Sequence, residues 1–319
     1  MSKKSRIRQR PDDRRQQTAE SAPVGPRQPC PCGSGRRYKH CHGRDSGAPA
    51  VFVARTFAGL PSECDWVALR EVVPAATAPL ALRNVPSERS VTVCTLLPMA
   101  LPAVVRMDGS VLLGLQQNVN HGDVSRDLAY ALELALDAEP GTQVTLPAPP
   151  PLGDRLAELV DPDGAFEVTV HDGFDFWVAD VDDPEGRLTE ALATANEAAS
   201  PTRRLTSVPA AYWTRMGERE FVRWVLPHEE SRALDALARL HASGADRLGE
   251  SGRLLGTFRA HGLIVPVWEM PSGTGPDAFD DALGALSSSL DDALSDESAL
   301  TSAQRSARNG LLTRQLTLR

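Results

Sequence analysis

Four side chains near the N-terminus have the types and the spacing of a closed metal site. Cys30 and Cys32 stand one residue apart, eight residues separate Cys32 from Cys41, and His42 follows directly. Structural zinc sites use four such sulfur and nitrogen ligands in a tetrahedron, which leaves no position open for water. In a reducing compartment, three cysteines this close together indicate a metal rather than disulfides. We therefore predict that Cys30, Cys32, Cys41 and His42 bind Zn²⁺.

The residues around these ligands suit a short loop that closes on a metal. Gly33 and Gly35 tolerate the tight backbone angles that such a turn requires. Tyr38, the aromatic residue of the segment 29–43, is expected to pack over the ligands. His40 is an additional imidazole that we take as exposed, although it could compete as a ligand. So short a segment has no hydrophobic core, and metal binding would supply its folding free energy. The alternative is an accidental cluster of cysteines.

Residues 29–43 resemble the SEC-C motif, the zinc module at the C-terminus of the bacterial translocation ATPase SecA. The resemblance covers 15 of 319 residues and includes the four ligands, the Gly-Ser-Gly turn, the aromatic residue and Lys39. The family often has lysines where Arg36 and Arg37 stand here, so the positive charge is kept. The chain has no G-x-x-x-x-G-K-[ST] sequence, and its motif is N-terminal, so the resemblance does not extend to the ATPase.

The resemblance also implies how the motif could act. In SecA the module binds the acidic chaperone SecB and has been linked to ribosome contact and lipid-proximal sites. By similarity, Arg36, Arg37 and Lys39 are expected to bind a partner, either an acidic protein face or the phosphates of ribosomal RNA. One aromatic residue offers no stacking platform, so the motif is not expected to read a nucleic-acid sequence.

The charge of the chain is divided between a basic head and an acidic remainder. Residues 1–45 hold 12 basic and 4 acidic residues, a net charge of +8, whereas residues 46–319 carry −16. Such asymmetry is typical of an interaction tail. It also permits an intramolecular alternative, in which the head folds back on the remainder.

Composition excludes several classes of function. All lysines (Lys3, Lys4 and Lys39) precede residue 40, so the rest of the chain cannot use a lysine as a phosphate ligand, Schiff base or general base. The first 22 residues lack the apolar core of a secretory signal, and the apolar stretch from Val91 to Val105 is too short to span a membrane. Strands explain that stretch better. We therefore expect a cytoplasmic protein without a transmembrane segment.

The predicted organisation has five parts. They are a disordered basic arm (1–28), a zinc knuckle (29–43), a linker (44–50), an α+β body (51–275, with a subdivision near 147–151) and a C-terminal helical segment (276–319). Within the body, the sequences Phe57–Pro61 and Glu63–Glu71 resemble an uncharacterised actinobacterial family that carries such a knuckle. That resemblance implies kinship without naming a function.

The body is expected to be an α+β fold built from repeated β-hairpin–helix units, with a helical C-terminus. Each unit has two strands around a Gly-containing turn and then a helix. The units are Ala103–Met107, Val111–Gln116 and helix Ser125–Ala138; Phe166–Val170, Phe174–Val178 and helix Leu188–Ala199; and Ala211–Met216, Arg219–Leu226 and a helix from Pro227 to His241. The later elements are helix Leu254–His261, strand Leu263–Met270, an acidic helix Asp277–Leu294 and a frayed or docked amphipathic helix in the last 19 residues.

Several groups of polar side chains could suggest other chemistry, but a structural role is the preferred interpretation of each. They are His121, Asp123 and Asp127 at a helix start; His171, Asp172 and Asp175 at a turn; His228, Glu229 and Glu230 in a first helical turn; and Asp180, Asp182 and Asp183 in an acidic loop. Acids near a helix N-terminus are favoured by its dipole, and aspartate tolerates turn angles. Calcium would need more ordered oxygen ligands than the acidic loop offers.

The remaining cysteines and all five tryptophans are expected to be buried. Cys64, at a helix start, could be reactive, but it and Cys94, in an apolar strand, more often have a packing role. The tryptophans fall in predicted elements and are expected in the core, with an exposed edge for a partner as the alternative. They are Trp66, Trp177, Trp213, Trp224 and Trp268.

Two functional hypotheses from different classes follow. The leading one is a non-enzymatic adaptor, in which the zinc knuckle docks on a macromolecule and the body has no assigned role. The alternative is an enzyme of unidentified chemistry with the knuckle as a targeting tag, although no nucleophile elbow or kinase signature is present. A pocket of converging His, Asp and Arg side chains would favour the enzyme, and a flat exposed face bearing Trp the adaptor. Nonspecific RNA binding through the arm is a third, weaker hypothesis.

Overall fold

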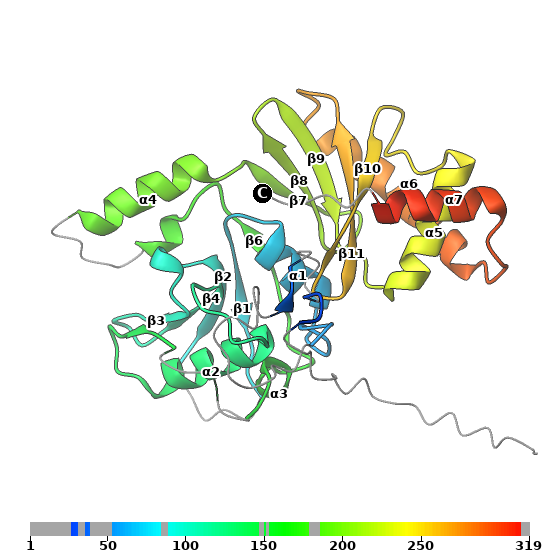
Figure 1. Ribbon diagram of the computed structural model, residues 1–319. Coiled ribbons are helices and arrows are strands. Elements are labelled where there is room, and N and C mark those ends of the chain that lie inside the picture. Colours follow the sequence, from blue (N-terminus) through cyan, green and yellow to red (C-terminus); the bar gives the residue numbers. More distant parts are fainter. Residues whose placement is uncertain are drawn as a thin grey trace, which may run out of the picture.

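The computed structural model of this chain describes residues 27–30, 36–38, 53–83, 89–146, 150, 153–178 and 186–313. Residues 53–313, here called the two-sheet region, form two β-sheets with helices around them (Figure 1). The fold is α+β with a helical C-terminus, as predicted. Most of the predicted arm (1–28) and all of the linker (44–50) lie outside the described residues. No helix in the described ranges has both the length and the apolar character that crossing a bilayer requires.

The first sheet contains six strands in the order β5-β3-β4-β2-β1-β6. They are β1 (Ala76–Leu80), β2 (Val91–Leu96), β3 (Ala103–Val105), β4 (Val111–Gln116), β5 (Gln143–Val144) and β6 (Thr169–Val170). β2 and β4 run parallel, with Val91 opposite Val111, whereas the other neighbouring pairs are antiparallel. The apolar stretch from Val91 to Val105 therefore forms two strands of this sheet, which confirms the prediction.

Four helices and two short 3-10 turns accompany the first sheet. They are α1 (Glu63–Glu71), η2 (Pro98–Ala100), α2 (Val124–Asp137), α3 (Leu156–Leu159), η3 (Asp175–Trp177) and α4 (Arg187–Ala198). α2 confirms the predicted helix: Leu128, Leu132 and Ala135 are buried on the side that packs against β3 and β4. Past its end, Gly141 adopts a φ of +84°, which glycine tolerates without strain.

The second sheet is antiparallel, with five strands in the order β10-β11-β9-β8-β7. They are β7 (Thr202–Leu205), β8 (Ala211–Met216), β9 (Arg219–Trp224), β10 (Arg253–Ala260) and β11 (Leu263–Met270). On the side away from the first sheet lie α5 (Glu230–Ser243), η4 (Asp277–Phe279), α6 (Asp280–Ser295) and α7 (Ser302–Thr313) (Figure 1). The basic C-terminal stretch is a docked amphipathic helix, because Leu311 of α7 is buried and Arg308 pairs with Asp235 of α5 at 2.5 Å.

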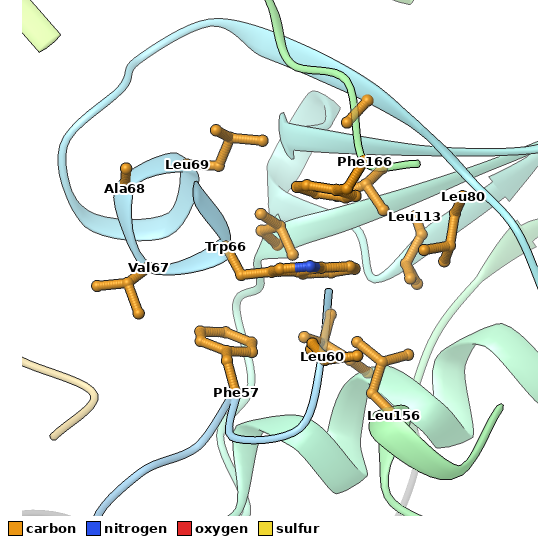
Figure 2. Close-up of a cluster of buried hydrophobic side chains, with 14 of the residues drawn as sticks. Phe57, Leu60, Trp66, Val67, Ala68, Leu69, Leu80, Leu113, Leu156 and Phe166 are labelled. Atoms are coloured by element: carbon orange, nitrogen blue, oxygen red, sulfur yellow. The ribbon is translucent and has the colours of Figure 1, made fainter. Parts of the chain in front are cut away.

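α1 lies between the two sheets and carries the centre of the largest core (Figure 1). Trp66 is fully buried between two aromatic rings, with ring centroids 6.0 Å from Phe57 and 4.3 Å from Phe166 (Figure 2). Its indole N–H donates a hydrogen bond to the carbonyl oxygen of Pro61 at 3.0 Å, so the one polar atom of the ring is satisfied. The same cluster includes Val93 of the first sheet and Val265 of the second, so both sheets share one core.

The chain enters the two-sheet region beside the turn between β10 and β11. Arg55 pairs with Glu63 at 2.7 Å and donates to the carbonyl oxygen of Pro227 at 3.3 Å. A Cβ atom at Gly262 would lie 2.6 Å from the carbonyl oxygen of Ala54, so this close approach requires glycine. The N-terminal end of the region is thereby fixed at one place on its surface.

The predicted helix Leu254–His261 is wrong, because this segment forms strand β10 and pairs with β11. Leu254 and Phe258 are spaced four apart and mimic a helical face, but they also fit an alternating strand. His261 and Gly262 form the two-residue turn, with φ of +47° and +82°, and two such angles are typical of a tight hairpin. The strand Leu263–Met270 is confirmed as β11.

The second predicted hairpin, Phe166–Val170 with Phe174–Val178, is also wrong. Residues 169 and 170 pair with β1, and residues 175–177 form η3. The glycine between them has a different role from a turn, because a Cβ at Gly173 would lie 2.5 Å from Asn196 Oδ1, which accepts from the backbone N–H of Phe174. The first and third hairpin–helix units are confirmed, as β3–β4 with α2 and β8–β9 with α5.

Candidate zinc knuckle and polar sites of the two-sheet region

The described part of the knuckle is a pair of antiparallel segments. Pro29 and Arg37 form an isolated bridge. The backbone N–H of Cys30 donates to the Arg36 carbonyl oxygen at 2.7 Å, and the N–H of Tyr38 donates to the Gln28 carbonyl oxygen at 2.8 Å. These two segments, residues 27–30 and 36–38, are here called the hairpin, and the sequence has Gly-Ser-Gly between them.

Burial separates the apolar and the basic residues of this hairpin. Cys30 is 5% exposed and Tyr38 is 4% exposed, whereas Arg36 and Arg37 are exposed. The other predicted ligands (Cys32, Cys41 and His42), together with His40 and Lys39, lie outside the described residues. The hairpin thus turns one predicted ligand inward and two predicted partner-binding cations outward.

This arrangement is compatible with a closed zinc site. Cys30 is buried, and the motif supplies two further sulfurs and an imidazole within 13 residues, which is the donor set that structural zinc prefers. Across the described ranges, the two knuckle segments included, no group of three or more His, Cys, Asp or Glu side chains is placed to hold a metal ion.

The polar group at the start of α2 makes capping and pairing interactions. It contains His121, Asp123 and Asp127. Asp123 caps α2 by accepting from the backbone N–H of Ser125 at 3.2 Å, and it also pairs with Arg155 at 3.1 Å. Asp127 accepts from the ring and from the backbone N–H of His121, both at 2.9 Å. The predicted structural role of this group is confirmed.

The other histidine groups are likewise structural. His171 Nε2 lies 2.8 Å from Thr77 Oγ1, and burial lowers its pKa, while exposed Asp172 pairs with Arg203 at 2.7 Å. Glu229 caps α5 by accepting from the backbone N–H of residue 232 at 3.1 Å. The acidic loop at residues 180–183 lies outside the described chain.

The cysteines and tryptophans of the two-sheet region belong to its interior. Burial raises the pKa of Cys64 and of Cys94 to about 12, so both thiols stay protonated and unreactive at neutral pH. All five tryptophans are buried, as expected, and Trp177 and Trp213 are the most exposed at 6%. An exposed Trp-bearing face, the alternative for partner binding, is therefore not present.

A buried polar network between the sheets was not apparent in the sequence. Asp65 of α1 accepts from the hydroxyl of Tyr212 at 2.7 Å and from the guanidinium of Arg204 at 2.9 Å. Burial raises the pKa of Asp65, and these two partners oppose the rise. Burial and the neighbouring carboxylate together raise the pKa of Tyr212 well above its usual value. In the sequence Asp65 has the appearance of an acid in a first helical turn, and nothing nearby indicates partners almost 150 residues away.

Two further carboxylates fix loops by accepting backbone hydrogen bonds. Burial alone would raise the pKa of Glu220, but it is lowered because the carboxylate accepts from Gly275 N, Trp213 Nε1 and Gly273 N at 2.8–3.0 Å. Asp280, at the start of α6, accepts from the turn at residues 206–207 through two backbone N–H groups and a hydroxyl, at 2.7–3.1 Å. These hydrogen bonds outweigh burial and lower the pKa of Asp280 to about 2.

Comparisons with known proteins separate the knuckle from the rest of the chain. Residues 27–44 match the SEC-C motif. In a stretch that includes this motif, the chain is 81% identical across 21 residues to the protein translocase subunit SecA of Acidithiobacillus ferrooxidans, which is 7% of this chain and 2% of the relative. It is 51% identical across 43 residues to SecA of Rubrobacter xylanophilus, which is 14% of this chain and 4% of the relative. The chain thus spans a few per cent of the length of these curated relatives.

The two-sheet region has a different relationship. No solved structure gives a significant match. Residues 56–319, most of the chain, match a family described as a family of unknown function, DUF5926. The chain therefore belongs to the DUF5926 family and carries a SEC-C motif in front of its family domain.

Proposed function

We propose that this protein is a zinc-binding adaptor of the cytoplasm, whose SEC-C knuckle docks on an acidic face of a protein partner. The observation that carries the proposal is the hairpin of residues 27–30 and 36–38, with Cys30 buried and Arg36 and Arg37 exposed. A surface that displays two cations on a fixed scaffold suits a partner of opposite charge, because complementary charge increases both association rate and specificity.

Zinc has a structural role in this proposal. Cys30, Cys32, Cys41 and His42 would hold it, and the ion would supply the folding free energy that so short a segment lacks. The matches to these two SecA relatives cover 21 and 43 residues of the chain, which is 2% and 4% of the relatives. Their translocase activity is therefore not part of the proposal.

A protein partner is favoured over a nucleic acid by the position of the aromatic ring. Proteins that bind single-stranded nucleic acids stack exposed aromatic rings on the bases. Tyr38 is buried, so the hairpin offers no such ring. Binding to RNA phosphates through the arginines alone remains as an outcome that the experiment distinguishes.

The test compares two double variants of the full-length protein that lose the same charge at different places. Arg36→Ser/Arg37→Ser removes two cations from the knuckle, whereas Arg203→Ser/Arg253→Ser removes two exposed arginines from the second sheet. Each protein is immobilised, its zinc content is measured, and it is exposed to native cytosol at moderate salt, with and without nuclease. The captured partner is identified and its affinity for each variant is measured.

We expect the knuckle variant to keep its zinc and to bind the partner at least about tenfold more weakly, because two charge contacts are lost. The second-sheet variant should bind normally, and nuclease should have no effect. Equal weakening in both variants, or no retained partner, would contradict the adaptor proposal. Loss of capture after nuclease treatment would instead identify RNA as the partner.

A further inference from the structure

An arginine is buried in the middle of the second sheet. Arg223 lies on β9, opposite Tyr212 of β8 and Val267 of β11, and it is 7% exposed. Successive residues of a strand point to opposite faces. The neighbours Val222 and Trp224 belong to the core under the outer helices, so Arg223 points to the other face, toward the first sheet.

No counter-ion for Arg223 is found in the described chain. Its buried Nε–H has no hydrogen-bond acceptor there, and no ion pair involves its guanidinium. Burial alone lowers its pKa to about 10, so the group still carries its charge at neutral pH. A buried unpaired charge is among the costliest features that a folded chain can keep.

Two carboxylates, Asp65 and Glu269, belong to elements that pack beside or within this sheet, and both already have partners. Asp65 uses one oxygen for Tyr212 and the other for Arg204. Glu269 lies two residues along β11 from the position opposite Arg223, and its oxygens pair with Arg219 and with Arg253. Both carboxylates are therefore paired with other arginines, and neither serves as a counter-ion for Arg223.

We propose that Arg223 anchors a binding site for a small oxyanion, a carboxylate or a phosphate group, on the inner face of the second sheet. A guanidinium presents parallel N–H donors that match two oxygens of either group. Apolar neighbours on the same face, such as Val267 and half-buried Phe221, would strengthen this contact because they exclude water. The site is independent of the knuckle and of its partner.

The first test measures thermal unfolding of the full-length protein with millimolar phosphate or acetate, at constant ionic strength, against chloride. We expect phosphate or acetate to raise the midpoint by about 2–4 °C, because a ligand that binds only the folded state stabilises it. Arg223→Met, which keeps the length of the side chain without its charge, should show no such rise. Its midpoint in chloride should equal or exceed that of the native protein, because an unpaired charge has been removed. Arg203→Met, at an exposed position on β7, is the matched control and should respond as the native protein does.

A second measurement covers the case in which Arg223→Met does not fold. The Nε–H resonance of a buried arginine is resolved by ¹⁵N NMR, and it is assigned here by its disappearance in Arg223→Lys. Titration of the native protein with phosphate or acetate should shift this resonance saturably. If neither anion shifts it, or if both anions raise the unfolding midpoints of Arg223→Met and the native protein equally, the proposal is wrong. The two anions together distinguish a phosphate site from a carboxylate site.

Discussion

Tyr38 of the knuckle and Trp66 of the two-sheet region are both almost completely buried, yet they lie in regions of very different size. Trp66 is packed between Phe57 and Phe166 in a core to which both sheets contribute. The matched SEC-C motif, at residues 27–44, is far too short to build a comparable core. Two side chains can thus be equally buried although different interactions supply the folding free energy. In the two-sheet region apolar contacts supply it, and in the proposed knuckle the metal does.

The largest expected effect is the loss of zinc, which should unfold the knuckle and leave the two-sheet region intact. Structural zinc contributes about 10–16 kcal/mol in isolated zinc-finger peptides. Either a chelator or Cys41→Ser should therefore abolish zinc binding and the exchange protection of the Tyr38 amide, which donates to Gln28. Zinc content and amide hydrogen exchange measure both effects.

Cys64→Ser is the matched control for this prediction, because Cys64 belongs to the two-sheet region and keeps its thiol protonated. It should leave zinc content unchanged. Should chelation lower the unfolding temperature of the two-sheet region by as much as it affects the knuckle, the two regions would be one cooperative unit and the comparison would fail.

The second largest expected effect is a loss of stability in the two-sheet region that leaves the knuckle unchanged. Trp66→Ala should lower the free energy of unfolding of the two-sheet region by about 3–5 kcal/mol, since it leaves a cavity at the centre of the shared core. Denaturant unfolding measures this change, and zinc content should remain normal. Met107→Ala removes a side chain that is 76% exposed, and it should change stability by less than about 0.5 kcal/mol. A small loss in Trp66→Ala would mean that the shared core does not stabilise the region.

The smallest effect concerns acid. The pKa of Asp280 is lowered to about 2 in the folded state, against about 3.9 in an unfolded chain. A depressed pKa stabilises the fold above the unfolded value, so this contribution is complete above about pH 4 and is lost as the pH falls toward about 2. Asp280→Asn should lack this part of the acid dependence in urea titrations between neutral pH and pH 3. Asp281→Asn, at an exposed neighbour, should keep it.

Acid also tests whether the knuckle and the two-sheet region unfold independently. Zinc ligands must be deprotonated to bind, so the knuckle should release its metal at a pH above the one at which Asp280 is protonated. Two separate acid transitions would support independent regions, whereas one shared transition would oppose them.

Local features of the fold could be predicted from the sequence. Helix α2 is predictable because Leu128, Leu132 and Ala135 repeat at helical spacing. The turn between β3 and β4 is predictable because Asp108 and Gly109 are residue types that favour tight turns. The SEC-C motif is likewise predictable, because its cysteines lie within a few residues of one another in the sequence.

Features that depend on distant partners could not be predicted. The spacing of Leu254 and Phe258 fits both a helix and a strand, and only pairing with β11 decides between them. Likewise, the roles of Asp65 and Arg223 are set by the packing of one sheet against α1 and the other sheet, which no local pattern records. The missed turn at His261 and Gly262 did carry a local signal, namely glycine in a two-residue loop.

The fixed entry of the chain at Ala54 has a consequence for how a docked partner would behave. Because Gly262 and the Arg55–Glu63 pair hold this point in place, Tyr38 can be no further from it than the contour length of the intervening chain, about 55 Å at roughly 3.4 Å per residue. A partner on the knuckle would then meet the surface of the two-sheet region at an effective concentration on the order of a millimolar. Because of this tether, even a weak contact between that surface and the partner would be populated. The affinity of the whole protein for the partner would then exceed that of the knuckle alone.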